Sequence, residues 1–343
     1  MSIIEPSAAV TSTIPHDYSK RAMVFGGRTS LDLAGKIAAK LQLAMGDVTL
    51  KTFSDGEIYG RYEESIRGAD VFLVQSTCQN NDAGMTPNDA LMELMIMADA
   101  AQGASAHRII AVMPWFGYAR QDKKSAPREP ITARVVARAL ESVGIDRVLT
   151  MDLHAGQIQG FFTIPVDHMT AMPMLTQWFT DQYRAEDLVV VSPDAGRAKA
   201  ARNFARKIGT DWAIMEKERP AQQVAEIGYV VGDVKDKIAV ISDDMIDTAG
   251  TLCAAASTVL DEGASSVIAC ATHGVFSGAA YDRLPYEKSG LEKIVVTDTI
   301  PLRAGAPENI TVLSTAGTLA DSIRRIFTDD SVSEIFAGEN QLF

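Results

Sequence analysis

The sequence predicts an α/β protein made of two similar parallel-sheet domains. Short apolar runs rich in Val and Ile alternate with helical stretches along most of the chain, and polar residues cluster directly after these runs. The segments 109–122 and 238–251 each combine an apolar run with a charged loop that leads into a helix, as a duplicated domain would. Because parallel sheets bind ligands at the carboxyl ends of their strands, the polar clusters are the candidate functional residues.

Length and composition narrow the class of protein. A chain of 343 residues, of which 47% are apolar, favours two globular domains. Its 44 acidic and 32 basic residues give a net charge of −12, which argues against a general binder of nucleic acid or of anionic membranes. No apolar run reaches the ~20 residues of a membrane span. The three cysteines have no metal-site spacing, so we expect a protein of the reducing cytoplasm.

The first part of the chain predicts an extension followed by alternating strands and helices. Residues 1–20 contain no basic residue before Lys20 and lack the start of a signal peptide, so we expect a disordered, nonessential extension. Residues 50–59 read as two extended pieces joined by the turn Ser54-Asp55-Gly56, which predicts a hairpin-like flap. We expect strands at 23–25, 71–75, 109–114 and 147–151, and helices at 31–43, at 88–102 and from about 131.

A basic loop follows the expected strand at 109–114. Between residues 120 and 134 there are five basic and two acidic residues, a local net charge of +3 in a chain that is acidic as a whole. The loop contains two prolines and little apolar content, which favours a mobile lid over a polyphosphate. A solvated loop is the alternative that composition leaves open. The basic residues are Arg120, Lys123, Lys124, Arg128 and Arg134.

Three further strand ends carry polar residues. The strand at 147–151 leads into Asp152 and His154, whose spacing suits a metal or polar site, and the strand at 187–191 leads into Asp194. The strand at 211–215 leads into Lys217 and Arg219, for which solvated surface charge is the simpler interpretation on spacing alone. We assign no catalytic role to the other histidines, which are His16, His107, His168 and His273.

The segment 236–252 carries the strongest functional pattern. A buried strand at 238–241 leads into Asp243 and Asp244, then into a loop of small and hydroxyl residues at 247–251, and then into an Ala-rich helix at 252–260. The N–H groups of such a loop and the start of the helix bind phosphate, and Gly250 lets the backbone approach it. The two carboxylates suit sugar hydroxyls or hydrated Mg²⁺. Further strands are expected at 266–272, 294–297 and 310–313, and a last helix at 319–327.

The loop at 247–251 resembles the ribose-phosphate loop of the type I phosphoribosyltransferase-like fold. From Met23 to Phe343 the chain also resembles the ribose-phosphate diphosphokinase family of the bacterial class I type, whose members make phosphoribosyl pyrophosphate (PRPP). The resemblance rests on short motifs in the family's order, which are Phe53–Glu57, Glu64–Gly68, Tyr118–Asp122, Arg128–Ile131, Asp152–His154, Gln157–Phe162, Ser192–Asp194, Lys217–Arg219, Asp243–Thr251 and Ser331–Ser333. A phosphoribosyltransferase that consumes PRPP would need neither the flap nor Lys217 and Arg219.

The resemblance implies roles for the matching residues. ATP would be bound by a flap from a neighbouring subunit and by the lid, with the residues Phe53, Asp55, Gly56, Glu57, Arg120, Gln121, Lys123 and Lys124. Mg²⁺ would be held by His154 and Asp194, with Asp152 beside them. Lys217 would be catalytic with Arg219 as its partner. Ribose 5-phosphate would be bound by Arg219, Asp243, Asp244, Asp247, Thr248, Ala249, Gly250 and Thr251.

The resemblance also implies a reaction and an assembly. The diphosphoryl group of MgATP would pass to the C1 hydroxyl of ribose 5-phosphate, giving PRPP and AMP, in a homohexamer built from dimers. A PRPP-binding regulator or an inactive synthetase-like partner is the alternative. We expect domains at 21–168 and 169–318, with residues 319–343 packing back on the first domain. The turn after Asp194 reads Gly196-Arg197 where relatives carry Gly-Gly, which leaves open whether Arg197 contacts a phosphate or only narrows the turn.

Overall fold

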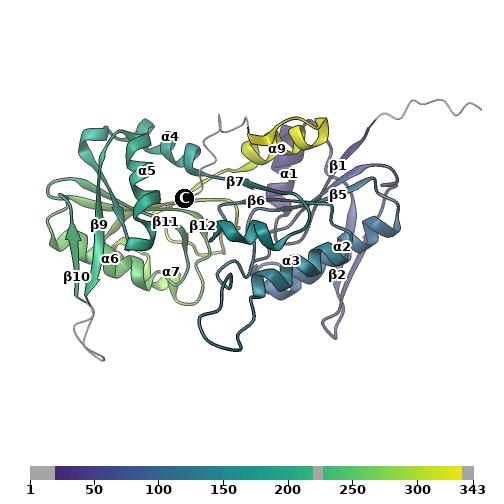
Figure 1. Ribbon diagram of the computed structural model, residues 1–343, viewed down its shortest axis with the longest axis horizontal. Helices are drawn as coiled ribbons and strands as arrows, with labels where there is room; N and C mark the ends of the chain where they lie inside the picture. Colours follow the sequence, from purple (N-terminus) through teal and green to yellow (C-terminus); the bar gives the residue numbers. More distant parts are fainter. Residues whose placement is uncertain (1–19, 219–226, 334–343) are drawn as a thin grey trace, which may run out of the picture.

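The predicted α/β class with parallel sheets is confirmed. A computed structural model describes residues 20–218 and 227–333, and its strands form two sheets and a separate hairpin (Figure 1). The first sheet has the order β1-β4-β5-β6-β7, and all its neighbouring strands are parallel. These strands are β1 (Ala22–Gly26), β4 (Asp70–Val74), β5 (Arg108–Met113), β6 (Arg147–Met151) and β7 (Val166–Met169).

The second sheet lies beside the first along the long axis of the molecule (Figure 1). Its order is β10-β9-β8-β11-β12-β13-β14, and only the edge strand β10 runs antiparallel to its neighbour. The strands are β8 (Leu188–Ser192), β9 (Asp211–Glu218), β10 (Ile227–Val231), β11 (Ile238–Ile246), β12 (Ser266–Gly274), β13 (Leu291–Thr297) and β14 (Ile310–Leu313). The central strand β8 and residues 238–241 of β11 are apolar on both faces, as strands covered by helices on each side must be.

Helices cover both faces of the two sheets and make a three-layer molecule (Figure 1). The last helix packs on the first, so the C-terminal end of the described chain returns to the first sheet. The longer helices are α1 (Leu31–Lys40), α2 (Pro87–Gly103), α3 (Thr132–Ser142), α4 (Met172–Gln182), α5 (Ala198–Ile208), α6 (Gly250–Asp261) and α9 (Ala316–Thr328), and the short ones are α7 (Ala280–Arg283) and α8 (Tyr286–Ser289). None of the helices within the described ranges is both long and apolar enough to cross a membrane.

The apolar core joins the two sheets. One buried cluster contains Val24 and Phe72 of the first sheet together with Val190 and Val240 of the second, and it lies under α1, α4, α5 and α9. Each sheet has a second cluster on its other face, under α2 and α3 or under α6. Because one layer of the core is shared, we expect the carboxyl ends of the two sheets to stay in a fixed relation. The domain limits at 168 and 318 remain a prediction.

Several element boundaries differ from the sequence-based expectation. The helix expected at 31–43 ends at Lys40. The strand expected at 211–215 runs to Glu218, so Lys217 lies within it. The strand expected at 238–241 runs to Ile246, so Asp243 and Asp244 lie inside the strand. The cause in β11 is its neighbour, because pairing with β8 ends at Ile241 while pairing with β12 continues.

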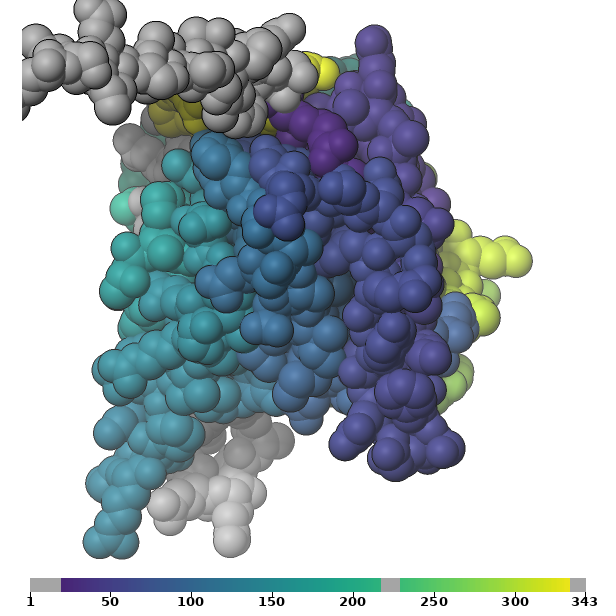
Figure 2. All heavy atoms as spheres, turned by 90° about the vertical axis from the view of Figure 1, so that its right-hand side faces the viewer, coloured from purple at the N-terminus to yellow at the C-terminus, as the bar shows by residue number. Residues whose placement is uncertain are grey.

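The predicted hairpin is present as β2 (Val48–Thr52) and β3 (Ile58–Tyr62), with Gly56 in the turn at a φ of 95° that favours glycine. The hairpin tip and the basic loop are exposed, and both project from the lower edge of the molecule in Figure 2. Residues 1–19 and 334–343 lie outside the described residues, and with them most of the predicted extension and the end of the predicted tail.

Candidate functional site

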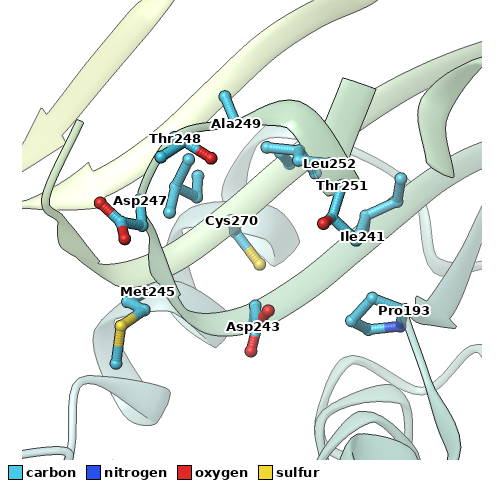
Figure 3. A pocket seen from close by; sticks show the side chains of 12 residues that line it. Pro193, Ile241, Asp243, Met245, Asp247, Thr248, Ala249, Thr251, Leu252 and Cys270 are labelled. Atoms are coloured by element: carbon cyan, nitrogen blue, oxygen red, sulfur yellow. The ribbon is translucent and has the colours of Figure 1, made fainter. Parts of the chain in front are cut away.

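The loop of residues 247–251 joins β11 to α6 and borders a cavity of about 220 Å³ (Figure 3). Ala249 takes a left-handed conformation with a φ of 60°, and α6 starts at Gly250. Since the first N–H groups of a helix lack partners within it, the start of this helix favours an anion. The side chains of Asp243, Asp247 and Thr251 border the same cavity. The cavity therefore offers backbone donors for a phosphate and carboxylates for hydroxyl groups.

The carboxylates of Asp243 and Asp244 are joined to a histidine and an arginine. His154 Nδ1 lies 2.6 Å from Asp244 Oδ2, across the boundary between the two sheets. Arg197 Nε lies 3.2 Å from Asp243 Oδ1, and its Nη2 forms an ion pair with Asp244 Oδ1. The backbone N–H of Asp244 also donates to Asp243 Oδ1 at 2.8 Å. The site thus brings together residues that follow β6 and β8 with residues of β11 that lie beyond its pairing with β8.

The two carboxyls differ in their affinity for a proton. Burial raises the pKa of Asp243 to about 7, and the neighbouring Asp244 adds to this effect through a hydrogen bond and its charge. Burial also opposes the ionisation of Asp244, but the hydrogen bond with His154 and the charge of Arg197 outweigh it and lower the pKa of that carboxyl. Asp244 therefore stays ionised beside His154, while Asp243 exchanges its proton near neutral pH.

A second set of contacts ties the basic loop to the loop at 247–251. Arg120, at the base of the basic loop, forms an ion pair with Asp247 Oδ2. The hydroxyl of Ser277 donates to the other oxygen of the same carboxylate. Arg283 donates from Nη1 to the carbonyl of Thr248 at 2.8 Å. Through the Arg120–Asp247 ion pair, a residue of the first half of the chain contacts the wall of the cavity in the second half.

The segment Asp152–His154 is held by buried groups on both sides. Asp152 has a φ of 31°, and its Oδ2 accepts hydrogen bonds from Ala171 N at 2.8 Å and from Thr272 Oγ1 at 2.6 Å. The N–H of Leu153 donates to His168 Nε2 at 2.7 Å. His273 Nε2 lies 3.1 Å from the carbonyl of Asp152. These bonds maintain a backbone conformation that is unfavourable for an aspartate and so set the direction of His154.

Both buried histidines of this arrangement are neutral. Burial lowers the pKa of His168 to about 4, and burial likewise lowers the pKa of His273. A neutral imidazole leaves His168 Nε2 free to accept the hydrogen bond from Leu153. The indole of Trp115 packs edge-on against His273, with 4.7 Å between the ring centroids. His168 and His273 therefore hold the backbone of Leu153 and Asp152 in place.

The remaining predicted residues lie at the edge of the site or on the hairpin. Asp194 caps the short turn after β8, with its Oδ1 accepting from Arg197 N at 3.0 Å. Gln121, Lys123 and Lys124 are exposed on the basic loop. On the hairpin, Phe53 is 44% exposed although its size is typical of a core residue, and Asp55 accepts a hydrogen bond from Glu57 N at 3.1 Å. All of these residues are exposed at the surface of the chain.

The predicted catalytic residues, Lys217 and Arg219, lie at the end of β9 and directly after it in the sequence. Lys217 lies near the end of β9, paired in register with Gly228 of β10. Arg219 lies outside the described residues. Their roles therefore rest on the resemblance alone.

The donor set of the predicted Mg²⁺ site has one structural feature of a metal ligand. A histidine that binds a metal almost always gives its other ring N–H to a carboxylate or carbonyl, and His154 Nδ1 is so placed against Asp244. Its Nε2 would then be the atom that could bind a metal. Asp152 is different, because its Oδ2 is engaged by Ala171 and Thr272. No group of three or more metal-binding side chains gathers within residues 20–218 and 227–333, and Mg²⁺ usually takes one or two protein ligands with water and substrate phosphates.

Several supporting residues had not been predicted from the sequence pattern. Thr272 and His273 lie near the end of β12 and Ser277 lies just after it, where the rule of strand ends points, whereas Arg283 lies on α7 and His168 lies inside β7. The contacts of these five residues join segments that are distant in the sequence.

Two family models match the chain. Residues 22–144 match the N-terminal domain of ribose phosphate pyrophosphokinase, and residues 213–337 match the phosphoribosyl synthetase-associated domain. The first match covers the hairpin and the basic loop, and the second covers β9 and the loop at 247–251.

Curated relatives and a solved structure match over nearly the whole chain. The ribose-phosphate pyrophosphokinase of Clostridium perfringens is 48% identical over 93% of this chain and 99% of its own length. The enzyme of the same name from Caldanaerobacter subterraneus is 49% identical over 93% of this chain and 99% of its own length. The crystal structure of phosphoribosylpyrophosphate synthetase from Mycobacterium smegmatis has a TM-score of 0.83 and 43% identity, and it covers 90% of this chain and 100% of that one.

Proposed function

The chain belongs to the ribose-phosphate pyrophosphokinase family, and from this premise we propose how its residues carry out the reaction. The protein is an enzyme that transfers the β,γ-diphosphoryl group of ATP to the C1 hydroxyl of ribose 5-phosphate, giving PRPP and AMP. The relatives above are named for this activity, so they lend no support to the alternative of a regulator or an inactive partner.

The cavity under the loop at 247–251 is the observation that carries the proposed ribose 5-phosphate site. The N–H groups of Thr248 to Thr251, at the start of α6, hold the 5-phosphate, because they form an anion site with a favourable helix dipole. Asp247, Asp243 and Asp244 face the sugar hydroxyls as hydrogen-bond acceptors. Arg120 must leave Asp247 when the sugar binds, which frees its guanidinium for the phosphates of ATP.

ATP binds on the other side of the acidic pair. Arg120, Gln121, Lys123 and Lys124 contact its phosphates from the basic loop, and a flap with Phe53, Asp55, Gly56 and Glu57 holds its adenine. His154 Nε2 and Asp194 are the proposed ligands of Mg²⁺, which when bound neutralises charge on the phosphates. Asp152 is better assigned to holding the segment of His154 than to the metal, because its Oδ2 already accepts two hydrogen bonds.

The chemistry relies on positioning and on positive charge. The C1 hydroxyl attacks the β-phosphorus in line with the departing AMP, and the enzyme forms no covalent intermediate. Lys217, Arg219 and Arg120 supply cations where negative charge spreads in the transition state. The basic loop closes over the site and excludes water, which would otherwise hydrolyse ATP.

A flap that reaches a neighbouring chain requires an oligomer, so the proposal includes one. The hairpin of β2 and β3 lies at the opposite end of the molecule from β9 and β10 (Figure 1), which supports a flap that serves a neighbouring chain. We therefore propose a homo-oligomer, a hexamer built from dimers, working in the cytoplasm.

Subunit mixing tests this division of roles. We expect Phe53→Ala with Glu57→Ala to impair the flap, and Lys217→Ala to impair the rest of the site. After subunit exchange in an equal mixture, about a quarter of the sites combine an intact flap with an intact core, so activity returns toward that fraction. The control mixes Lys217→Ala with His154→Ala, which both damage the core and give no recovery. A flap mixture that exchanges subunits and stays inactive contradicts a shared site.

A further inference from the structure

Arg197 reaches from the end of β8 to the acidic pair of β11. Its side chain is 21% exposed, and its backbone is held by the cap that Asp194 gives to the turn 195–197. Its guanidinium contacts Asp243 Oδ1 through Nε and Asp244 Oδ1 through Nη2, and Nη2 also lies 3.5 Å from His154 Nδ1. One arginine thus meets both carboxylates and the histidine.

These contacts engage three of the four carboxylate oxygens of the pair. Asp244 Oδ2 is taken by His154, Asp244 Oδ1 by Arg197, and Asp243 Oδ1 by Arg197 and the N–H of Asp244. Two adjacent carboxylates attract divalent ions, and they also repel the phosphate of a sugar that binds a few ångströms away. The fork of a guanidinium satisfies such a pair with directed hydrogen bonds.

We propose that Arg197 is the resident counter-ion of Asp243 and Asp244. It excludes free divalent cations from the pair and keeps both carboxylates oriented for the hydroxyls of a ribose phosphate. Arg197 is therefore a positioning residue for the sugar. It lowers the affinity of the site for free metal ions and raises its affinity for a sugar phosphate. The sugar-binding part rests on the function proposed above, whereas the exclusion of cations follows from the ion pairs alone.

Metal binding without substrates tests the exclusion of cations. We titrate the intact protein with Mn²⁺, without nucleotide or sugar, and follow free Mn²⁺ by electron paramagnetic resonance. Arg197→Gln should bind Mn²⁺ about tenfold more tightly than the unchanged protein, because two carboxylates lose their cation. The matched control is Arg202→Gln, the same charge change at an exposed position of α5, which should leave the Mn²⁺ affinity as it was. Equal shifts in the two variants, or no shift in Arg197→Gln, overturn the proposal.

Sugar binding tests the positioning part. Calorimetry of ribose 5-phosphate in the absence of metal should show about tenfold weaker binding to Arg197→Gln and unchanged binding to Arg202→Gln. Arg197→Lys keeps the charge and loses the fork, so it should exclude Mn²⁺ like the unchanged protein but bind the sugar more weakly. If Arg197→Gln does not fold, Arg197→Lys alone tests the positioning of the sugar. Sugar binding by Arg197→Lys as tight as in the unchanged protein contradicts the role of the guanidinium fork. If the unchanged protein binds no ribose 5-phosphate, the proposed function fails, while the Mn²⁺ result still decides the exclusion of cations.

Discussion

Replacing Lys217 by alanine should lower kcat by roughly 10²–10³-fold, the usual effect of losing one group that stabilises transition-state charge. KM for ribose 5-phosphate should change little, because the lysine is proposed to act on the β-phosphoryl group during transfer. Steady-state rates with each substrate varied in turn separate the two constants. Lys235→Ala, at an exposed position before β11, is the control and should behave like the unchanged enzyme. A variant with raised KM and unchanged kcat would mean that Lys217 only binds the ground state.

Replacing Asp247 by asparagine should chiefly weaken the binding of ribose 5-phosphate. The substitution keeps the size of the side chain and removes the charge that accepts hydrogen bonds, and hydrogen bonds to charged groups are worth ~1.5–3 kcal/mol, which corresponds to roughly 10–100-fold in KM. Steady-state kinetics with ribose 5-phosphate varied measures the effect.

The matched control for Asp247 is Asp261→Asn, the same change at the exposed far end of α6. The substitution also releases Arg120 from its ion pair with Asp247. Because Arg120 is proposed to bind the phosphates of ATP, the KM for ATP should not rise in parallel. An unchanged KM for ribose 5-phosphate would remove Asp247 from the site.

The positions of most strands along the chain and of the main loop were predictable because the signals are local. An apolar run such as 238–241 marks a buried strand, and a loop of small residues followed by an Ala-rich helix marks an anion site, whatever the rest of the chain does. The length of β11 was not predictable in this way. Asp243 and Asp244 are polar, and only the continued pairing with β12 keeps them in the strand.

The contacts that complete the site depend on residues far apart in the sequence. Arg120 and Asp247 are 127 positions apart, and His154 and Asp244 are 90 apart, so no local pattern relates them. The contacts of Asp152 are a further example. Its place after a strand predicts a metal ligand, which stays a prediction, and no local pattern indicated that Ala171 and Thr272 would donate hydrogen bonds to its Oδ2.

Two arginines form ion pairs with the acidic residues of the site, because Arg120 pairs with Asp247 and Arg197 pairs with Asp243 and Asp244. The two ion pairs are proposed to differ in whether they persist when the substrates bind. Arg120 is proposed to move from Asp247 to the phosphates of ATP, whereas Arg197 is proposed to stay with the carboxylates. The acidic residues are therefore balanced before either substrate arrives, which favours the binding of anionic ligands.

The products of a single reaction mixture test the central claim most directly. Purified protein is incubated with Mg²⁺, ATP and ribose 5-phosphate, and the phosphorus NMR spectrum is followed with time. Diphosphoryl transfer predicts that AMP and PRPP appear in equal amounts and that neither forms when ribose 5-phosphate is left out. The appearance of ADP in place of AMP, or no product at all with inorganic phosphate present, would contradict it.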